Sequence, residues 1–485
     1  MLDQFKKLIG HSAIYGLSVA GSTIGLMILT PLFLHRLSRA EYGVNEVLNV
    51  TASMLYTFLL LGIGSVYIKY YVNDCKDEEE RHVMFSSMFY AAVGVSVVLF
   101  LLSCAISESV SVALFKSPKY AYLVRLSMIA GGSQLALIMV NTCLRSKQWA
   151  LKFVMVSLTQ FLAVVLLNVY LVGMRNQGVF GVQLSSVICY LIAVSVGLFL
   201  LRSDLVWRFS SRVLRNVLLI SLPVFPATLA PWVLNVSDRY FLSHYCGLAD
   251  TGLYAAGYKV GMVGMFVFIT ATQYAWPPVF FASSDSQDTR RLCANYSKHY
   301  LLLLAVAALG FSLFAPEIIR LIASREYWPA HWIVPYIAAS YVFYGFQFFT
   351  IPFFIKTNKG KQLSYIMGGC AIGKLLLNVI LIPLYGLSGA VISVVIIFGI
   401  EVILSMLLAN KFYPIAYPYA NLAKILVLSA VVYVVFRGME ATSALSLVLK
   451  LAAFPVLAIL LFITRFFSQS EMALMGKALR RVLPS

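Results

Sequence analysis

The stretch of sequence that decides the fold runs from Pro223 to Lys259 and reads P-V-F-P-A-T-L-A-P-W-V-L-N-V-S-D-R-Y-F-L-S-H-Y-C-G-L-A-D-T-G-L-Y-A-A-G-Y-K. It contains part of one apolar segment, 212–236, and the start of a second, 252–275. Each segment is long enough to cross a bilayer as an α-helix, which rises ~1.5 Å per residue and needs about 20 residues. A short polar connection, 237–251, joins them, so the stretch predicts a transmembrane helical hairpin.

The composition of the whole chain extends this prediction. Of its 485 residues 61% are hydrophobic and only 12% are charged, which is typical of a protein that crosses the membrane many times. The apolar runs are continuous rather than alternating, which excludes a β-barrel. The net charge of +18 comes from basic residues scattered between the apolar spans. This pattern indicates that the basic residues set the topology of the chain in the membrane and contact membrane lipids. It excludes a nucleic-acid partner.

Fourteen apolar spans are expected, which makes the chain an all-α polytopic membrane protein. The N-terminal tail, the even-numbered connections and the C-terminal tail together carry 22 Lys and Arg residues, and the opposite side carries 8. Because positive residues concentrate in the cytoplasm, both termini are expected there. The spans are about 12–34, 44–72, 83–105, 121–144, 150–173, 179–201, 212–236, 252–275, 299–323, 332–355, 362–382, 387–409, 421–437 and 444–467.

The two halves of the chain repeat each other at an offset of about 210 residues. R-A-E-Y-G-V at 39–44 recurs as L-A-D-T-G-L at 248–253, and L-N-V-Y-L-V…G-V-F-G-V at 167–182 recurs as L-N-V-I-L-I-P-L-Y-G-L-S-G-A at 377–390. An even number of helices per unit preserves orientation, so the halves form a parallel repeat about an axis along the membrane normal. The predicted divisions are an N-terminal six-helix lobe, a C-terminal six-helix lobe, and two additional helices with a cytoplasmic tail, at 1–205, 206–411 and 412–485.

Several motifs together resemble one family, the polysaccharide-biosynthesis flippases of the multidrug/oligosaccharidyl-lipid/polysaccharide (MOP) exporter superfamily, the Wzx type. The resemblance covers nearly the whole chain, and none of its motifs is a catalytic signature. The motifs are L-x-R-L-S-x-x-E-Y-G at 34–43, L-L-L-G-I-G at 59–64, S-D-R-Y-F-L at 237–242, D-T-G-L-Y-A-A-G-Y-K at 250–259 and N-V-I-L-I-P-L-Y-G-L-S-G-A at 378–390.

The resemblance implies a fold and a role. The fold would be a V-shaped, MATE-like bundle of two lobes whose central cavity opens alternately to each side. The role would be to move a polyprenyl-pyrophosphate-linked oligosaccharide from the cytoplasmic to the periplasmic leaflet of the bacterial inner membrane. The product would feed O-antigen, capsule or exopolysaccharide assembly, with a polysaccharide polymerase and a chain-length regulator as implied partner proteins.

Basic residues inside the spans are the first candidates for a site. A charge within a membrane helix costs at least ~2.5 kcal/mol on insertion scales, so it needs a partner, a wet cavity or a ligand. Lys259 and Lys374 lie inside the eighth and eleventh spans, and Arg239 lies at the outer end of the seventh. Lysine and arginine are the donors that a pyrophosphate requires, so we assign these three to pyrophosphate binding. The alternative for Lys259 and Arg239 is that they reach the membrane surface.

Two carboxylates accompany these cations. Glu401, in the twelfth span, is expected either to balance a lysine or to take up a proton for coupling. Asp238 is expected to have the same coupling or charge-balancing role, or to cap a helix at the interface. Since sequence neighbours do not share a helix face, we do not expect Asp238 and Arg239 to pair with each other.

Aromatic and amide side chains near the cations are candidates for sugar contacts. Tyr254 and Tyr258 lie on the helix of Lys259, and Asn168 and Asn378 occupy equivalent positions of the repeat. We expect the two tyrosines to stack on sugar rings and the two asparagines to form hydrogen bonds with the sugars. Aromatic packing and hydrogen bonding between helices are the alternatives.

Two other function classes compete with the flippase. A cation-coupled multidrug antiporter of the same superfamily would place carboxylates in the cavity, but the first span, 12–34, contains no Asp or Glu. A membrane-embedded glycosyltransferase or polymerase would be expected to carry a large polar loop, and none is present. The six histidines and seven cysteines form no catalytic or metal-binding pattern, so we expect neither an enzyme nor a cofactor or metal.

Overall fold

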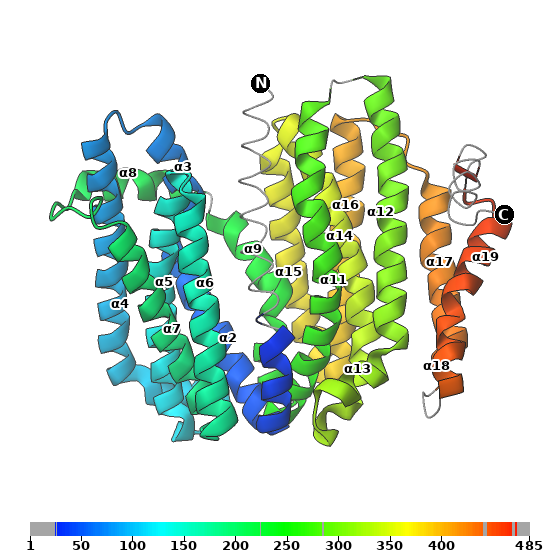
Figure 1. Ribbon diagram of the computed structural model, residues 1–485, viewed down its shortest axis with the longest axis horizontal. Coiled ribbons are helices and arrows are strands. Elements are labelled where there is room, and N and C mark those ends of the chain that lie inside the picture. Colours follow the sequence, from blue (N-terminus) through cyan, green and yellow to red (C-terminus); the bar gives the residue numbers. More distant parts are fainter. Residues whose placement is uncertain are drawn as a thin grey trace. The chain divides into compact units, whose positions relative to one another are not determined.

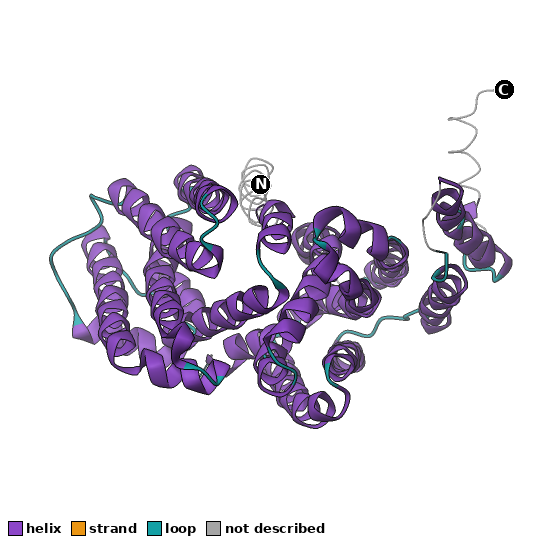
Figure 2. Cartoon of the chain, turned by 90° about the horizontal axis from the view of Figure 1, so that it is seen from below, coloured by secondary structure: helices purple, strands orange, loops and turns teal. Residues whose placement is uncertain are grey.

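The structure of the protein is a computed structural model that describes residues 25, 27–223, 225–283, 286–439, 444–467, 471 and 472. Throughout this part of the chain every regular element is a helix, with loops between them (Figures 1 and 2). Ten of these helices are long and apolar enough to cross a membrane, and a bent pair, α8 and α9, makes an eleventh. The chain is therefore a multi-pass helical membrane protein, as predicted.

The described residues form two compact units, and each is considered by itself. The first unit comprises residues 1–259, 322–330 and 360–397. It contains α2 (Arg39–Leu60), α3 (Ile63–Asn73), α4 (Glu78–Phe115), η1 (Pro118–Tyr120), α5 (Ala121–Ser146), α6 (Ala150–Asn168), η2 (Val169–Met174), α7 (Gly178–Leu200), α8 (Ser211–Ser221), α9 (Phe225–Val236), α10 (Asp238–Tyr245), α15 (Gly360–Tyr385) and the first parts of α11 (Leu248–Ala282) and α16 (Leu387–Phe412).

The second unit comprises residues 260–321, 331–359 and 398–485. It contains the remainder of α11 and α16 together with α12 (Gln287–Leu313), α13 (Ala315–Ile322), α14 (Ile333–Lys356), α17 (Tyr419–Phe436), α18 (Ala444–Leu451) and α19 (Ala453–Ile463), while the 3-10 helix η3 (Arg325–Trp332) ends in it. The predicted lobe boundaries at residues 205 and 411 stay predictions.

The predicted spans correspond to the observed helices with local differences. Three spans, those expected at 44–72, 299–323 and 444–467, are each divided in two, into α2 and α3, α12 and α13, and α18 and α19. The seventh span, 212–236, is bent by 60° between α8 and α9. Most of the first predicted span, 12–34, lies outside the described residues.

The break between α2 and α3 has a local cause in the backbone. Leu61 and Gly62 both adopt left-handed conformations, with φ of 47° and 74°, which ends the regular hydrogen bonding of α2. Glycine tolerates this conformation because it lacks a Cβ atom. The motif L-L-L-G-I-G at 59–64 therefore marks a helix break inside the predicted span.

The start of α2 is determined by its own sequence. The hydroxyl of Ser38 accepts a hydrogen bond from the backbone N–H of Glu41, and the Glu41 carboxylate accepts one from the backbone N–H of Ser38. This capping box satisfies two donors that a helix terminus otherwise leaves unpaired. It places Tyr42, Gly43 and Glu46 on the first two turns of α2.

Two glycines allow α2 and α11 to cross in direct backbone contact. A Cβ atom on Gly43 would lie 1.9 Å from the carbonyl oxygen of Leu248, and one on Gly252 would lie 2.0 Å from the carbonyl oxygen of Arg39. Any larger residue would push the helices apart at this point. Gly43 and Gly252 are the equivalent glycines of the repeated motifs at 39–44 and 248–253, so the two copies of the motif meet each other.

Candidate functional site

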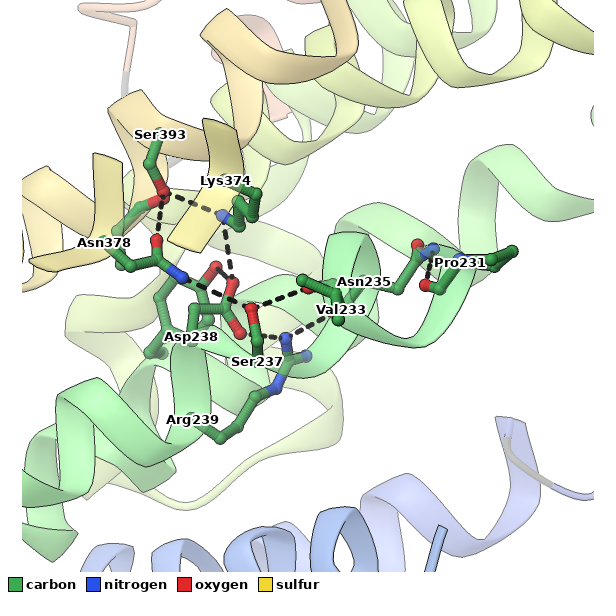
Figure 3. Close-up of polar contacts among 11 residues, drawn as sticks. Pro231, Val233, Asn235, Ser237, Asp238, Arg239, Lys374, Asn378 and Ser393 are labelled. Carbon is green, nitrogen blue, oxygen red and sulfur yellow. Dashed lines mark hydrogen bonds and ion pairs between the residues drawn. The ribbon is translucent and has the colours of Figure 1, made fainter. Parts of the chain in front are cut away.

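An ionic cluster surrounds Asp238 at the beginning of α10 (Figure 3). One carboxylate oxygen lies 2.5 Å from the guanidinium of Arg239, and the other lies 3.6 Å from the ammonium of Lys374. The hydroxyl of Tyr254 donates a 2.6 Å hydrogen bond to that second oxygen. The structure thus brings together four of the residues that the sequence singled out.

The pairing of Asp238 with Arg239 corrects an expectation. We did not expect neighbours in sequence to pair, but these two lie at the first turn of α10, directly after α9 ends at Val236. From there the long side chain of Arg239 turns back and also donates to the carbonyl oxygen of Asn235 at 2.7 Å. Its side chain is only 5% exposed, so Arg239 does not reach an aqueous surface in this structure.

A chain of hydrogen bonds continues from Lys374 across two helices (Figure 3). The ammonium of Lys374 donates to the hydroxyl of Ser393 at 2.7 Å, and this hydroxyl donates to the side-chain oxygen of Asn378 at 2.7 Å. The amide nitrogen of Asn378 reaches the hydroxyl of Ser237 at 3.4 Å. Lys374, Asn378 and Ser393 are fully buried. Sequence reasoning missed Ser393, because a serine within an apolar helix carries no signal of its own.

Lys259 makes a separate ion pair with a residue of α2. Its ammonium lies 2.8 Å from the carboxylate of Glu46 and donates to the hydroxyl oxygen of Tyr42 at 3.0 Å. Because α11 begins at Leu248 rather than at the expected residue 252, Lys259 lies ~16 Å along its helix, too deep to reach the end of the helix. Sequence reasoning missed this partner; the only available signal was an acidic residue at the start of an apolar span.

The aromatic rings of Tyr254 and Tyr258 lie beside Arg239. The guanidinium of Arg239 lies 4.1 Å from the ring centroid of Tyr258 and 5.4 Å from that of Tyr254, within the range of cation–π attraction. Both tyrosines are buried. In this conformation the rings therefore pack against a cation, and their predicted contact with sugars stays a prediction.

The charges of the side chains in the Asp238 cluster and in the Lys259–Glu46 pair do not cancel. They comprise three cations and two carboxylates, which leaves one positive charge in excess. Buried charges are costly unless they are compensated, and ionisable groups within membrane helices generally mark binding or transport sites. We define these five residues as the ionic site, namely Lys259, Arg239, Lys374, Asp238 and Glu46.

Two predicted residues lie apart from the ionic site in the contacts they make. Asn168, at the end of α6, donates to the carbonyl oxygen of Val164 at 2.7 Å, and its side-chain oxygen has no hydrogen-bond partner in the described residues. Glu401, in the part of α16 that belongs to the second unit, is 2% exposed. Within the described ranges no lysine forms an ion pair with Glu401, and its Oε2 atom has no hydrogen-bond partner.

Solved membrane transporters share this fold. The structure of the lipid II flippase MurJ in an inward closed conformation matches with a TM-score of 0.72 and 13% sequence identity, over 94% of this chain and 99% of that one. An inward-facing multidrug resistance MATE transporter of the MOP superfamily matches with a TM-score of 0.66 and 14% identity, over 80% and 94%. The MATE multidrug transporter DinF-BH matches with a TM-score of 0.57 and 17% identity, over 84% and 95%.

At these identities the structural matches establish the fold, and they confirm the predicted MATE-like, all-α architecture. A search of curated protein sequences finds no match to the chain. A protein-family profile described as "Polysaccharide biosynthesis protein" matches residues 33–331, which is more than half of the chain. The predicted family is thus confirmed, and the chain belongs to the polysaccharide biosynthesis protein family.

Proposed function

We propose that this protein is a flippase that moves a polyprenyl-pyrophosphate-linked oligosaccharide repeat unit from the cytoplasmic to the periplasmic leaflet by alternating access. The observation that carries this proposal is the ionic site. Its excess positive charge lies among membrane helices, where an anionic pyrophosphate needs charged donors to compensate for lost hydration. The family and the transporter fold agree with such a role.

Within the ionic site Lys259 is the group that we assign to the pyrophosphate. The side chains of Lys259 and Glu46 are 16% and 10% exposed, whereas those of Lys374 and Asp238 are fully buried. Lys374 and Arg239 then contribute positive potential, and they contact the headgroup only in a more open conformation. Tyr254, Tyr258, Asn168 and Asn378 are proposed to contact the sugars in that conformation.

The setting of this activity is also a proposal. The excess of Lys and Arg on one side of the predicted spans supports an inner-membrane protein with both termini in the cytoplasm. The translocated unit would serve O-antigen, capsule or exopolysaccharide synthesis. A polymerase and a chain-length regulator would then act on it after it crosses the membrane.

A second candidate function, a cation-coupled multidrug antiporter, is favoured by one observation. Glu401 is a buried carboxylate in a transmembrane helix without an ionic partner in the described residues, and such a group is suited to bind a proton or a cation. Two of the three similar transporters are MATE multidrug transporters. The net positive charge of the ionic site argues against cationic drugs as its ligands.

The deciding experiment is a deletion of the gene in its native host, followed by extraction of polyprenyl-linked saccharides. A membrane-impermeant reagent that modifies sugars then reports which leaflet holds them. The flippase proposal requires complete repeat units that accumulate on the cytoplasmic face and are cleared when the gene is restored. Complete units that reach the periplasmic face at the normal rate would exclude it, and drug accumulation in the same strain would test the antiporter.

A further inference from the structure

The ion pair between Lys259 and Glu46 joins the same two helices whose glycines cross. Glu46 lies one turn beyond Gly43 on α2, and Lys259 lies two turns beyond Gly252 on α11. The crossing itself consists of backbone contacts that need no side chain. The pair of opposite charges therefore supplies an attraction between α2 and α11 directly beside this contact.

In this structure the ammonium of Lys259 already donates hydrogen bonds to two oxygen atoms. Two of its three donors are used by the carboxylate of Glu46 and the hydroxyl oxygen of Tyr42. A phosphate oxygen is also an anionic acceptor, so a phosphate that takes more than the remaining donor of the ammonium replaces Glu46 there. Glu46 and a phosphate group thus compete for one cation.

The Lys259–Glu46 pair is accessible to a ligand, unlike the rest of the ionic site. The Lys259–Glu46 pair retains partial exposure, whereas Asp238 and Lys374 are fully enclosed. Arg239 also interacts electrostatically with Glu46, so the carboxylate stays near a positive charge when it leaves Lys259. Displacing Glu46 therefore exchanges its partner without leaving a carboxylate isolated in the membrane.

We propose that Glu46 is an internal counter-ion that the substrate's pyrophosphate displaces from Lys259, and that this exchange releases the α2–α11 crossing. The inference rests on the proposed flippase function and adds a positioning residue to it. Before binding, the Glu46–Lys259 pair holds the two helices together. After binding, Lys259 serves the phosphate, the attraction between the helices is lost, and they separate at the glycine crossing.

The first test measures binding of farnesyl pyrophosphate, a short polyprenyl pyrophosphate, to the purified full-length protein in lipid nanodiscs. Farnesol serves as the uncharged control ligand. Removing the competing charge in Glu46→Gln is expected to tighten binding roughly 3- to 10-fold, the scale of a partly exposed ion pair. Lys259→Gln is expected to weaken it at least as much, and Glu46→Gln added to Lys259→Gln is expected to produce no further gain.

Matched variants separate competition from a purely structural ion pair. Glu41→Gln changes another acid of α2, one that forms a capping box in which glutamine is also accepted, and it should leave affinity unchanged. Glu46→Asp withdraws the carboxylate from Lys259 and should produce an intermediate gain in affinity for farnesyl pyrophosphate. This variant keeps the test decisive if Glu46→Gln folds poorly. A structural pair would instead lower thermal stability and leave affinity equal or weaker in both Glu46 variants, which overturns the inference.

The second test reports separation of the helices. Ala256, on α11 one turn beyond Gly252, is 1% exposed, so a cysteine placed there in a background without the seven natural cysteines should react slowly with a maleimide. Farnesyl pyrophosphate or Glu46→Gln should accelerate this reaction, whereas farnesol should not. An unchanged rate in both cases contradicts the release of the crossing.

The outcomes distinguish the two levels of the argument. If the wild-type protein binds farnesyl pyrophosphate no better than farnesol, the proposed pyrophosphate site fails. If it binds the pyrophosphate through Lys259 but Glu46→Gln and Glu46→Asp bring no gain, only the role of Glu46 fails.

Discussion

Gly43 on α2 and Gly252 on α11 face each other so closely that neither position has room for a Cβ atom. The added atom would lie 1.9 Å or 2.0 Å from a carbonyl oxygen of the opposite helix. These glycines belong to the two copies of one repeated motif. The contact therefore lies where the two copies meet, beside the Lys259–Glu46 pair.

Gly252→Ala is expected to destabilise the protein by about 1–3 kcal/mol, because the methyl group forces the two backbones apart. Thermal unfolding in detergent would measure the loss. Gly94→Ala is the matched control, since a Cβ atom at Gly94 would meet nothing within 4 Å and alanine favours a helix. Equal melting temperatures for Gly252→Ala and the wild-type protein would contradict the crossing as described.

Asp238→Asn is expected to destabilise the protein far more than Lys374→Met. Losing Asp238 leaves Arg239 and Lys374 as two enclosed cations without their counter-ion, a change that costs about 3–5 kcal/mol for a single buried pair. Replacing Lys374 by methionine leaves the Asp238–Arg239 pair intact and neutral overall. Expression level and thermal unfolding of the two variants should rank in this order, and the reverse ranking would show that Asp238 is not the central counter-ion.

Lys374→Met is also expected to abolish transport while the protein remains folded. The substitution removes the excess positive charge of the ionic site, which the proposed anionic substrate requires. Surface polysaccharide in a complemented deletion strain provides the readout, and membrane insertion is checked separately. Normal polysaccharide from a correctly inserted Lys374→Met protein would remove Lys374 from the proposed site.

Lys259→Gln is expected to reduce surface polysaccharide at least tenfold, whereas Lys259→Arg should retain part of the activity because it keeps the charge. Lys69→Gln is the control, since Lys69 is a helical lysine of the same unit, on α3, but is exposed. Equal polysaccharide levels in Lys259→Gln and Lys69→Gln would count against a special role for Lys259.

Glu401→Gln is expected to leave thermal stability within about 1 kcal/mol of the wild-type value, because the neutral amide replaces a group without an ionic partner in the described residues. If Glu401 carries the coupling proton, the variant transports at a rate that no longer responds to a proton gradient. Proteoliposomes with and without an imposed pH difference would measure this response. A variant that responds as the wild-type protein does would exclude Glu401 from coupling.

Much of the fold could be predicted from sequence because the relevant signals are local. The apolar runs predicted the membrane helices, and the repeated motifs predicted which segments correspond. The motif at 34–43 supported the family and contains the Ser38–Glu41 capping box that begins α2. Lys374 could be identified as a candidate because a lysine in the middle of a membrane helix is costly wherever that helix packs.

Hydropathy could not predict where the helices would break. Gly62 ends α2 inside an apolar span, and the bend between α8 and α9 likewise interrupts a continuous apolar run. Apolar character persists across both points, so nothing in the hydropathy distinguishes a broken span from a straight one.

The sequence by itself determined that this protein is a helical membrane protein of the polysaccharide biosynthesis protein family and that it has cations inside its spans. Only the tertiary structure decided which carboxylate each cation meets. Glu46 and Lys259 are 213 residues apart, and the neighbours Asp238 and Arg239 pair because the Arg239 side chain folds back along the end of α9, where it also donates to the carbonyl oxygen of Asn235. The physical reason is that hydropathy and helical period depend on neighbouring residues, whereas ion pairing depends on the rotation and register of packed helices, which glycine contacts such as Gly43–Gly252 set.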